Sequence, residues 1–249
     1  MADVDAALPG LDRDALVALA GRWDDGGLWD DIAVLASRFW DAGPTPGPHR
    51  SRCWHHLVLA VGNFKREAGR RLRPALDTSD AVAVRPGRSL VVFGTEPAVV
   101  VAVDDRSSWP ALSGALAGAG VATTTTLLAA LWDGQHLVFD RRVAGAANAL
   151  RAAAGMSTAA GYEPDATAAP AISFAHYDVV RAWVRNHARA TGVGVVVVER
   201  ALYELDRLRR RARPAPPGPL KRARSRRLPA VTGTRDGVAG RLCQPGRVD

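Results

Sequence analysis

Two glycines separated by one residue, Gly118-Ala-Gly120, lie between two segments of helical spacing, 107–116 and 121–131. Such glycines let the main chain turn tightly and present consecutive backbone N–H groups. These donors, with the positive end of the following helix, can hold a phosphate. The first residues of that helix belong to the same predicted site, namely Val121 and the hydroxyl-bearing Thr123 and Thr124. The spacing therefore predicts a clamp for a DNA backbone.

A basic segment earlier in the chain is a second candidate for phosphate contacts. Residues 65–73 contain one acid, Glu67, and five cations, Lys65, Arg66, Arg70, Arg71 and Arg73. Cations crowded near a helix end can bind phosphates without reading sequence. The alternative is that they form an ordinary solvated helix face.

Between the glycine turn and the next predicted helix, 141–153, Asp140 is the acidic residue placed for a chemical role. It follows a short extended stretch, His136-Leu-Val-Phe, and precedes Arg141-Arg-Val. Aspartate in that position accepts hydrogen bonds from the first amides of a helix. A capping role alone therefore stands as an alternative to any chemical role.

The stretch from Leu116 through Gly118 and Gly120 to Leu128 resembles the Leu-Pro-Gly-Val-Gly hairpin of the helix-hairpin-helix DNA glycosylases, a superfamily that includes endonuclease III and 8-oxoguanine glycosylase. In that family a catalytic aspartate follows on a short extended segment, and His136–Val143 resembles this segment. The resemblance covers about residues 51–206 and is most specific over 112–143. It implies an all-α fold, DNA as the partner and Asp140 as the catalytic residue.

The chain is also similar to a group of bacterial proteins with an 8-oxoguanine-glycosylase-like fold. That similarity rests on an Asp-x-Arg-Val segment at Asp140 and on the stretches 177–183 and 198–203. Members of the superfamily that also nick DNA carry a lysine two residues after the second hairpin glycine. Ala122 stands there, so the resemblance implies base removal without a lyase step.

Base removal requires a pocket for a flipped-out base, and such pockets are built from aromatic and polar side chains. Five residues are candidates for it: Trp54, Asn63, Phe64, Tyr177 and Trp183. The buried carboxylate would stabilise positive charge on the sugar and orient a water molecule. No cofactor or metal is expected, because the only cysteines are Cys53 and Cys243 and no histidine spacing suggests a ligand set.

The remaining segments are expected to position these residues. Helical periodicity predicts further helices over 10–22, 28–42, 51–73, 174–190 and 194–210, and composition predicts a loop over 154–170. Residues 81–103 are rich in valine, which favours strands. Because the surrounding segments are helical, we expect this region to be helical as well.

The net charge of +8 is unevenly distributed. Residues 207–249 carry 13 Lys and Arg and two acids, a net +11, and the remainder carries −3. The basic tail fits contact with nucleic acid or the codon bias of a GC-rich genome. We expect a helical lead-in over 1–48, the glycosylase-like domain over 49–210 and a disordered tail over 211–249. No membrane span or secretory signal is found, so a cytoplasmic location is expected.

Three functions are compatible with these features. The first is a monofunctional DNA N-glycosylase acting on a damaged or modified base. The second is a DNA-binding protein with the same fold and no catalysis, which the missing lysine favours. The third is a protein-interaction module that has lost its DNA-binding face, which the −3 charge of residues 1–206 favours.

Overall fold

The computed structural model describes residues 8–42, 47–65, 73–74, 82–85, 89–92, 99–117, 119–159 and 172–212. Several sequence predictions fall outside these ranges and concern Gly118, Arg66, Arg70, Arg71, most of the 154–170 loop and the tail from residue 213.

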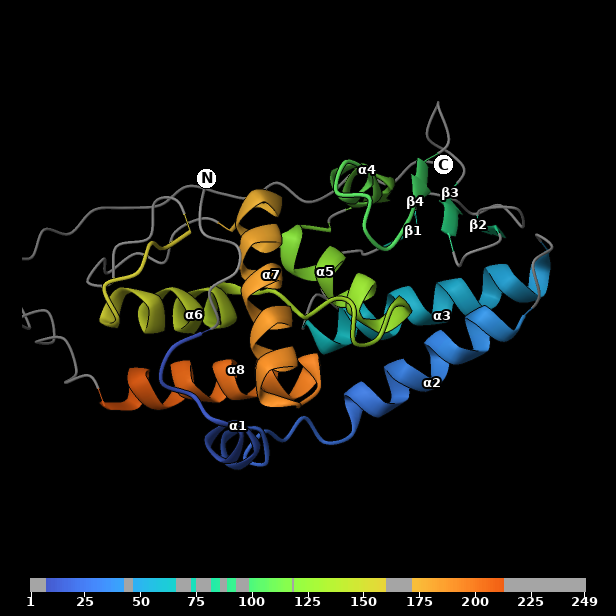
Figure 1. The fold of residues 1–249 in the computed structure, drawn as a ribbon. Helices are drawn as coiled ribbons and strands as arrows, with labels where there is room; N and C mark the ends of the chain where they lie inside the picture. The colour runs from blue at the N-terminus through green and yellow to red at the C-terminus, as the bar shows by residue number, and fades with distance from the viewer. Residues whose placement is uncertain are drawn as a thin grey trace, which may run out of the picture. The chain divides into compact units, whose positions relative to one another are not determined.

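Helices dominate the part of the chain that the structure describes (Figure 1). They are α1 (Arg13–Ala20), α2 (Leu28–Asp41), α3 (Pro48–Phe64), α4 (Ser108–Ala115), α5 (Val121–Leu131), α6 (Arg141–Ala153), α7 (Phe174–Thr191) and α8 (Val195–Ala212). The mostly helical character predicted from periodicity is confirmed. The helix expected over 51–73 is shorter, because α3 ends at Phe64.

The helix predicted over 81–103 is wrong. Strands β2 (Val82–Arg85), β3 (Ser89–Val92) and β4 (Val99–Val101) form an antiparallel sheet in the order β2-β3-β4. Leu90 pairs with Val84 on one side and with Val101 on the other. Leu90, Val91 and Val101 are buried, whereas Val100 is exposed, and a valine-rich run suits such a partly buried pleated surface.

A second, two-stranded ladder joins the basic segment to the glycine turn. Strand β1 (Arg73–Pro74) pairs antiparallel with β5 (Leu116–Ala117), and Arg73 lies opposite Ala117. The hydroxyl of Ser113 also donates to the carbonyl of Ala119 at 2.8 Å. The chain entering α5 is therefore fixed by contacts with both α4 and β1.

Helix α5 lies in the core. Every residue from Thr123 to Leu131 is buried, and α5 packs against α2, α3 and α4. A helix that is apolar on all sides belongs in an interior. Two of its threonines bond within the helix, since the hydroxyls of Thr125 and Thr126 both donate to the carbonyl of Ala122, at 3.1 and 2.7 Å.

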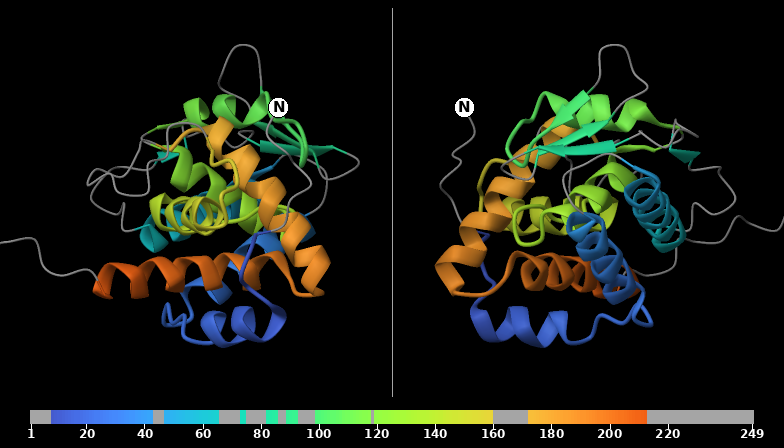
Figure 2. Two further views of the ribbon diagram at one scale, coloured as in Figure 1. Left: turned by 60° about the vertical axis from the view of Figure 1, so that its left-hand side comes forward. Right: turned by 90° about the vertical axis from the view of Figure 1, so that its right-hand side faces the viewer.

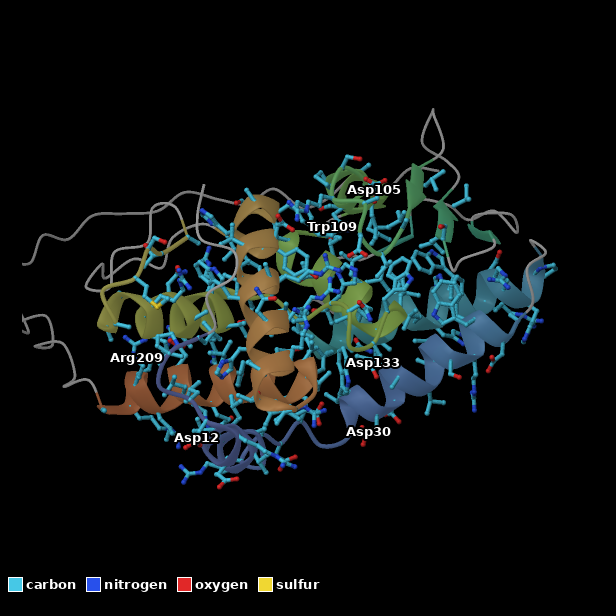
Figure 3. All side chains as sticks on the ribbon, viewed as in Figure 1. Asp12, Asp30, Asp105, Trp109, Asp133 and Arg209 are labelled. Atoms are coloured by element: carbon cyan, nitrogen blue, oxygen red, sulfur yellow. The ribbon has the colours of Figure 1, made fainter. Side chains whose placement is uncertain are left out.

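The remaining helices pack around this centre (Figure 2). Helix α8 contacts α1, α6 and α7, and α2 lies along α3. Charged residues such as Asp12 and Asp30 lie at the surface, whereas Trp109 is fully buried (Figure 3). None of the described helices has the length and hydrophobicity required to cross a membrane.

Candidate functional site: a carboxylate at the start of α6

The extended stretch from His136 to Asp140 connects α5 to α6 and has no strand partner among the described residues. Residues 136–139 are nevertheless buried. Buried backbone groups must find hydrogen bonds elsewhere, and here side chains of other helices supply them.

His136 fixes the beginning of the stretch. Its Nε2 lies 2.8 Å from the carbonyl oxygen of Val103, and its Nδ1 lies 2.6 Å from the hydroxyl of Tyr177. Burial lowers the pKa of His136 to about 3, so the ring is neutral. A carbonyl can only accept, so Nε2 carries the proton and the Tyr177 hydroxyl donates to Nδ1.

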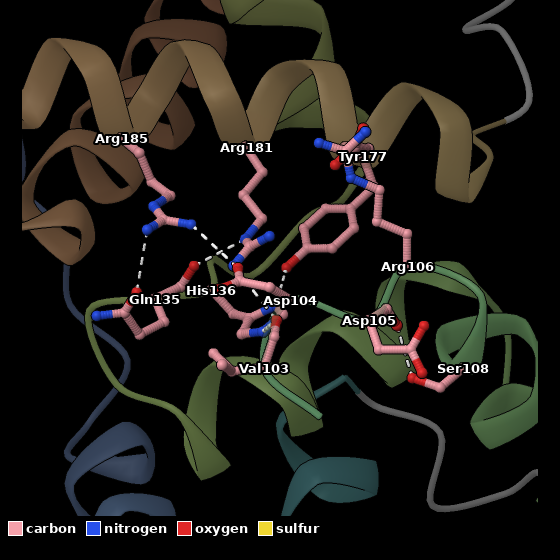
Figure 4. A network of polar contacts seen from close by, with 11 residues as sticks. Val103, Asp104, Asp105, Arg106, Ser108, Gln135, His136, Tyr177, Arg181 and Arg185 are labelled. Carbon is pink, nitrogen blue, oxygen red and sulfur yellow. Dashed lines mark hydrogen bonds and ion pairs between the residues drawn. The ribbon is translucent and has the colours of Figure 1, made fainter. Parts of the chain in front are cut away.

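Arg181 of α7 makes further hydrogen bonds beside His136 (Figure 4). Its guanidinium donates to the carbonyl of Gln135 at 2.8 Å and to the carboxylate of Asp104 at 2.8 Å. The hydrogen bond from Arg181 holds the pKa of Asp104 below its usual value. Arg185, one turn further along α7, donates to Asp104 and to the side chain of Gln135. The turn before His136 is thereby tied to both α7 and the end of β4.

Three helices then bind the next three backbone amides. The Leu137 N–H donates to the hydroxyl of Tyr177 on α7. The Val138 N–H donates to the Glu199 carboxylate on α8 at 2.9 Å. The Phe139 N–H donates to the Thr125 hydroxyl on α5 at 3.2 Å.

Asp140 follows immediately and is the N-cap of α6. Its Oδ1 accepts hydrogen bonds from Arg142 N at 2.9 Å and from Val143 N at 3.1 Å. The predicted capping role is therefore present. The second oxygen, Oδ2, is not used by the cap and faces Lys65 at 3.7 Å from Nζ. The Asp140 side chain is 24% exposed, so the carboxylate is partly accessible while one of its oxygens caps the helix.

Lys65 approaches this carboxylate from the end of α3. Its side chain is only 12% exposed, and its ammonium lies 5.4 Å from the centre of the Phe64 ring. Among the 33 cationic residues of the chain, only Lys65 and Lys221 are lysines. An amine can act as a nucleophile where a guanidinium cannot.

Glu199 is the third ionisable group near this point. It is buried, and burial raises its pKa to about 8 despite the hydrogen bond from Val138 and the attraction of Lys65. The negative charge of Asp140 raises the Glu199 pKa further. At neutral pH, Glu199 is therefore mainly a neutral acid that holds the stretch leading to Asp140.

The structure does not bring the predicted base-pocket residues together at the surface. Three of them are buried, with exposed fractions of 2% or less: Trp54, Tyr177 and Trp183. Trp54 packs on Phe39 in the core, and Trp183 lies 4.1 Å beneath the Arg151 guanidinium. Tyr177 bonds the His136 ring and the Leu137 backbone instead of facing a base.

The two other candidates for the base pocket lie at the end of α3. Asn63 is exposed, and Phe64 is half-buried against Trp29, with ring centres 5.7 Å apart. Of the five predicted residues, these two adjoin Lys65 and hence the Asp140 carboxylate.

The predicted phosphate site at α5 is only partly available. Gly120 is exposed, Val121 is half-buried, and no side chain caps the N-terminus of α5. Thr123 and Thr124 are buried at 5% and 0% exposure, so the prediction that their hydroxyls contact a phosphate is wrong for this conformation. The backbone amides at the start of α5 are the remaining donors.

Within the described ranges, no three His, Cys, Asp or Glu side chains gather as metal ligands would. Comparison with protein families, with curated proteins and with solved structures found no match. The geometry is therefore the basis for any statement about function.

From the sequence alone Glu199 is assigned to an ordinary ion pair on the last helix and not to a site, although another signal was present. Glu199 lies four residues after Val195 and three before Leu202, both buried on the apolar stripe of α8. An acid in such a stripe must have a buried partner. The pairing of Lys65 with Asp140 had no comparable signal, because it depends on where the end of α3 lies relative to the start of α6 in the folded protein.

Proposed function

We propose that this protein is a DNA N-glycosylase of the helix-hairpin-helix type, with Asp140 as the catalytic carboxylate. The observation that supports this most is the position of Asp140. Its Oδ1 caps α6, its Oδ2 pairs with Lys65, and its side chain is 24% exposed. Residues 136, 138 and 139 before it are hydrogen-bonded to side chains of α7, α8 and α5. Helix α4, the glycine turn, α5, the extended stretch and Asp140 follow one another in the order that the family resemblance implies.

In the proposed reaction the bond between the base and C1′ of the sugar breaks, and positive charge builds on the sugar. Oδ2 of Asp140 stabilises that charge and orients the water that attacks C1′. The base leaves with the bonding electrons and takes up a proton. The stretch from 136 to 139 contributes by preventing the carboxylate from moving as charge develops.

Two described residues of the basic segment support contact with DNA. Its first residue, Lys65, pairs with Asp140, and its last residue, Arg73, pairs through its backbone with Ala117 beside the glycine turn. Phosphates could be bound by the amides at the start of α5 and by the Lys65 ammonium.

The test is release of free base from a panel of duplexes that each contain one damaged or modified base. Wild-type protein and Asp140→Asn are compared, and binding to each duplex is measured in parallel. Release by wild type, and its loss in a variant that still binds, supports the proposal. Binding without release from any duplex would leave the non-catalytic DNA-binding function, and absence of binding at low salt would favour the interaction module.

Lys65 suggests a second candidate function, base removal followed by strand cleavage. Although Ala122 occupies the position of the family's lysine, Lys65 brings an amine within 3.7 Å of Asp140 from another element. In this reaction the Lys65 nitrogen bonds to C1′ as the base departs, and the sugar ring opens to an imine. Loss of a proton from C2′ then expels the 3′-phosphate. Trapping of the imine, described below, separates the two functions.

A further inference from the structure

A cleft lies between α2 and α3, at the end of α3 that is remote from Lys65. Its volume is about 480 Å³, within the range of pockets that hold small molecules. The two helices lie side by side here (Figures 1 and 2). Leu35 and Ala42 form part of its lining, so it offers some apolar surface as well.

The polar lining of the cleft includes two arginines and two histidines. Arg38 comes from α2, and His49, Arg52 and His56 come from α3. Among the described residues, neither Arg38 nor Arg52 has an ion-pair partner. The lining includes one carboxylate, Asp41, which accepts a hydrogen bond from Ser37 at 3.2 Å. Helix α3 itself contains no acidic residue.

Arg50 adds a buried positive charge at the same end of α3. It is 1% exposed, its guanidinium lies 5.1 Å from the centre of the Phe39 ring, and none of its three side-chain nitrogens has a hydrogen-bond partner among the described residues. It interacts electrostatically with Cys53, which lines the cleft. A buried cation without a counter-ion strengthens the positive potential at nearby surfaces.

This cleft is separate from the Asp140 site. Lys65 follows His56 by nine residues, which is about two and a half helical turns at 3.6 residues per turn. The cleft and the Lys65 side chain therefore lie on opposite sides of α3. Whatever binds in the cleft does so independently of the function proposed for Asp140.

We propose that this cleft binds the phosphate or pyrophosphate group of a nucleotide-sized ligand. Two unpaired guanidinium groups offer paired N–H donors that match phosphate oxygens, and the volume leaves room for a group beyond the phosphate. The phosphate can belong to a free small molecule or to the end of a nucleic-acid strand.

Cys53 provides a direct readout, because it lines the cleft with its Sγ 4.0 Å from His49 Nε2. Replacing the other cysteine in full-length protein, Cys243→Ser, leaves a single thiol. The rate of Cys53 alkylation by iodoacetamide is measured against increasing pyrophosphate, with potassium chloride of equal ionic strength as the control. We expect saturable protection of at least several-fold. Protection is lost in Arg38→Gln and Arg52→Gln and kept in Arg13→Gln, a matched change at an exposed arginine of α1.

The source of the phosphate is tested with oligonucleotides that carry a 5′-phosphate or a 5′-hydroxyl. If pyrophosphate protects Cys53 from alkylation, the ligand is a free small molecule. If only the strand with a 5′-phosphate protects it, the ligand is the end of a nucleic-acid strand. The proposal would be overturned if the 5′-phosphate and 5′-hydroxyl strands protected Cys53 from alkylation equally. It would also be overturned if potassium chloride of equal ionic strength slowed alkylation as much as pyrophosphate does. Thermal unfolding of each arginine variant establishes that it folds, so loss of protection reports on binding.

Discussion

The Lys65 ammonium lies 3.7 Å from Oδ2 of Asp140, while Oδ1 of the same carboxylate caps α6. The Asp140 carboxylate therefore uses one oxygen to cap α6 and has a second oxygen that takes no part in the cap. The capping role and the chemical role, which are alternatives when only the sequence is considered, are compatible here because they use different atoms.

Thr125 should be needed for the stability of the stretch that carries Asp140. Thr125→Val removes the hydroxyl that accepts from Phe139 N and leaves that buried amide without a partner. An unsatisfied buried group costs about 1–3 kcal/mol, so urea unfolding should show a loss of that size. Thr126→Val is the matched control, because the Thr126 hydroxyl donates only within α5 and its loss should cost less. Equal losses in the two variants would contradict this account.

Glu199 should make stability fall as pH rises. Its pKa is about 8 in the folded protein against 4.5 when unperturbed, so the folded state holds the proton more tightly than the unfolded state. The free energy of unfolding should therefore decrease between about pH 4.5 and pH 8, by at most about 1.4 kcal/mol per pH unit. It should level off above that range.

Glu199→Gln isolates this effect, since glutamine can still accept from Val138 N and does not titrate. Urea unfolding at pH 5, 6.5 and 8 should show the wild-type free energy falling relative to that of the variant. His136 acts in the opposite sense below pH 6.5 because its folded pKa is lowered, but it is present in both proteins and cancels. Parallel pH profiles would show that Glu199 is ionised throughout.

Lys65 can be tested by trapping a covalent intermediate. If it attacks the sugar, borohydride should reduce the imine and leave protein attached to the substrate strand, visible as a slower band in a denaturing gel. Lys65→Arg keeps the positive charge beside Asp140 and should abolish trapping. Lys221→Arg, which changes the only other lysine, should have no effect. Base release without trapping in wild type would establish the monofunctional reaction.

The helices were predictable because their apolar residues recur at helical spacing, as in α7, where Tyr177, Val180 and Val184 are all buried. The sheet was missed because context was given more weight than the valine-rich composition of 81–103. Pro86-Gly87 between two valine-rich runs was a turn signal that favoured a hairpin. Strand propensity here agreed with the structure.

The candidate site was predictable at Asp140 and less so around it. The Asp-x-Arg-Val pattern was enough to place a cap at the start of α6, and the structure has that cap. The aromatic candidates failed because a tryptophan on a helix stripe has the same sequence signature whether it lines a pocket or fills a core. Trp54 and Trp183 fill the core. Which side chains bind the amides of residues 137–139 depends on tertiary packing alone.

The most direct test of the central claim is the single-turnover rate of base release by wild type and Asp140→Asn on the best duplex of the panel. Asparagine retains an oxygen for the cap, so the variant should fold and bind DNA with an affinity within a few-fold of wild type. Base release should slow by at least about 100-fold, the loss typical when one electrostatic stabiliser of a transition state is removed. Release at the wild-type rate would show that Asp140 only caps α6.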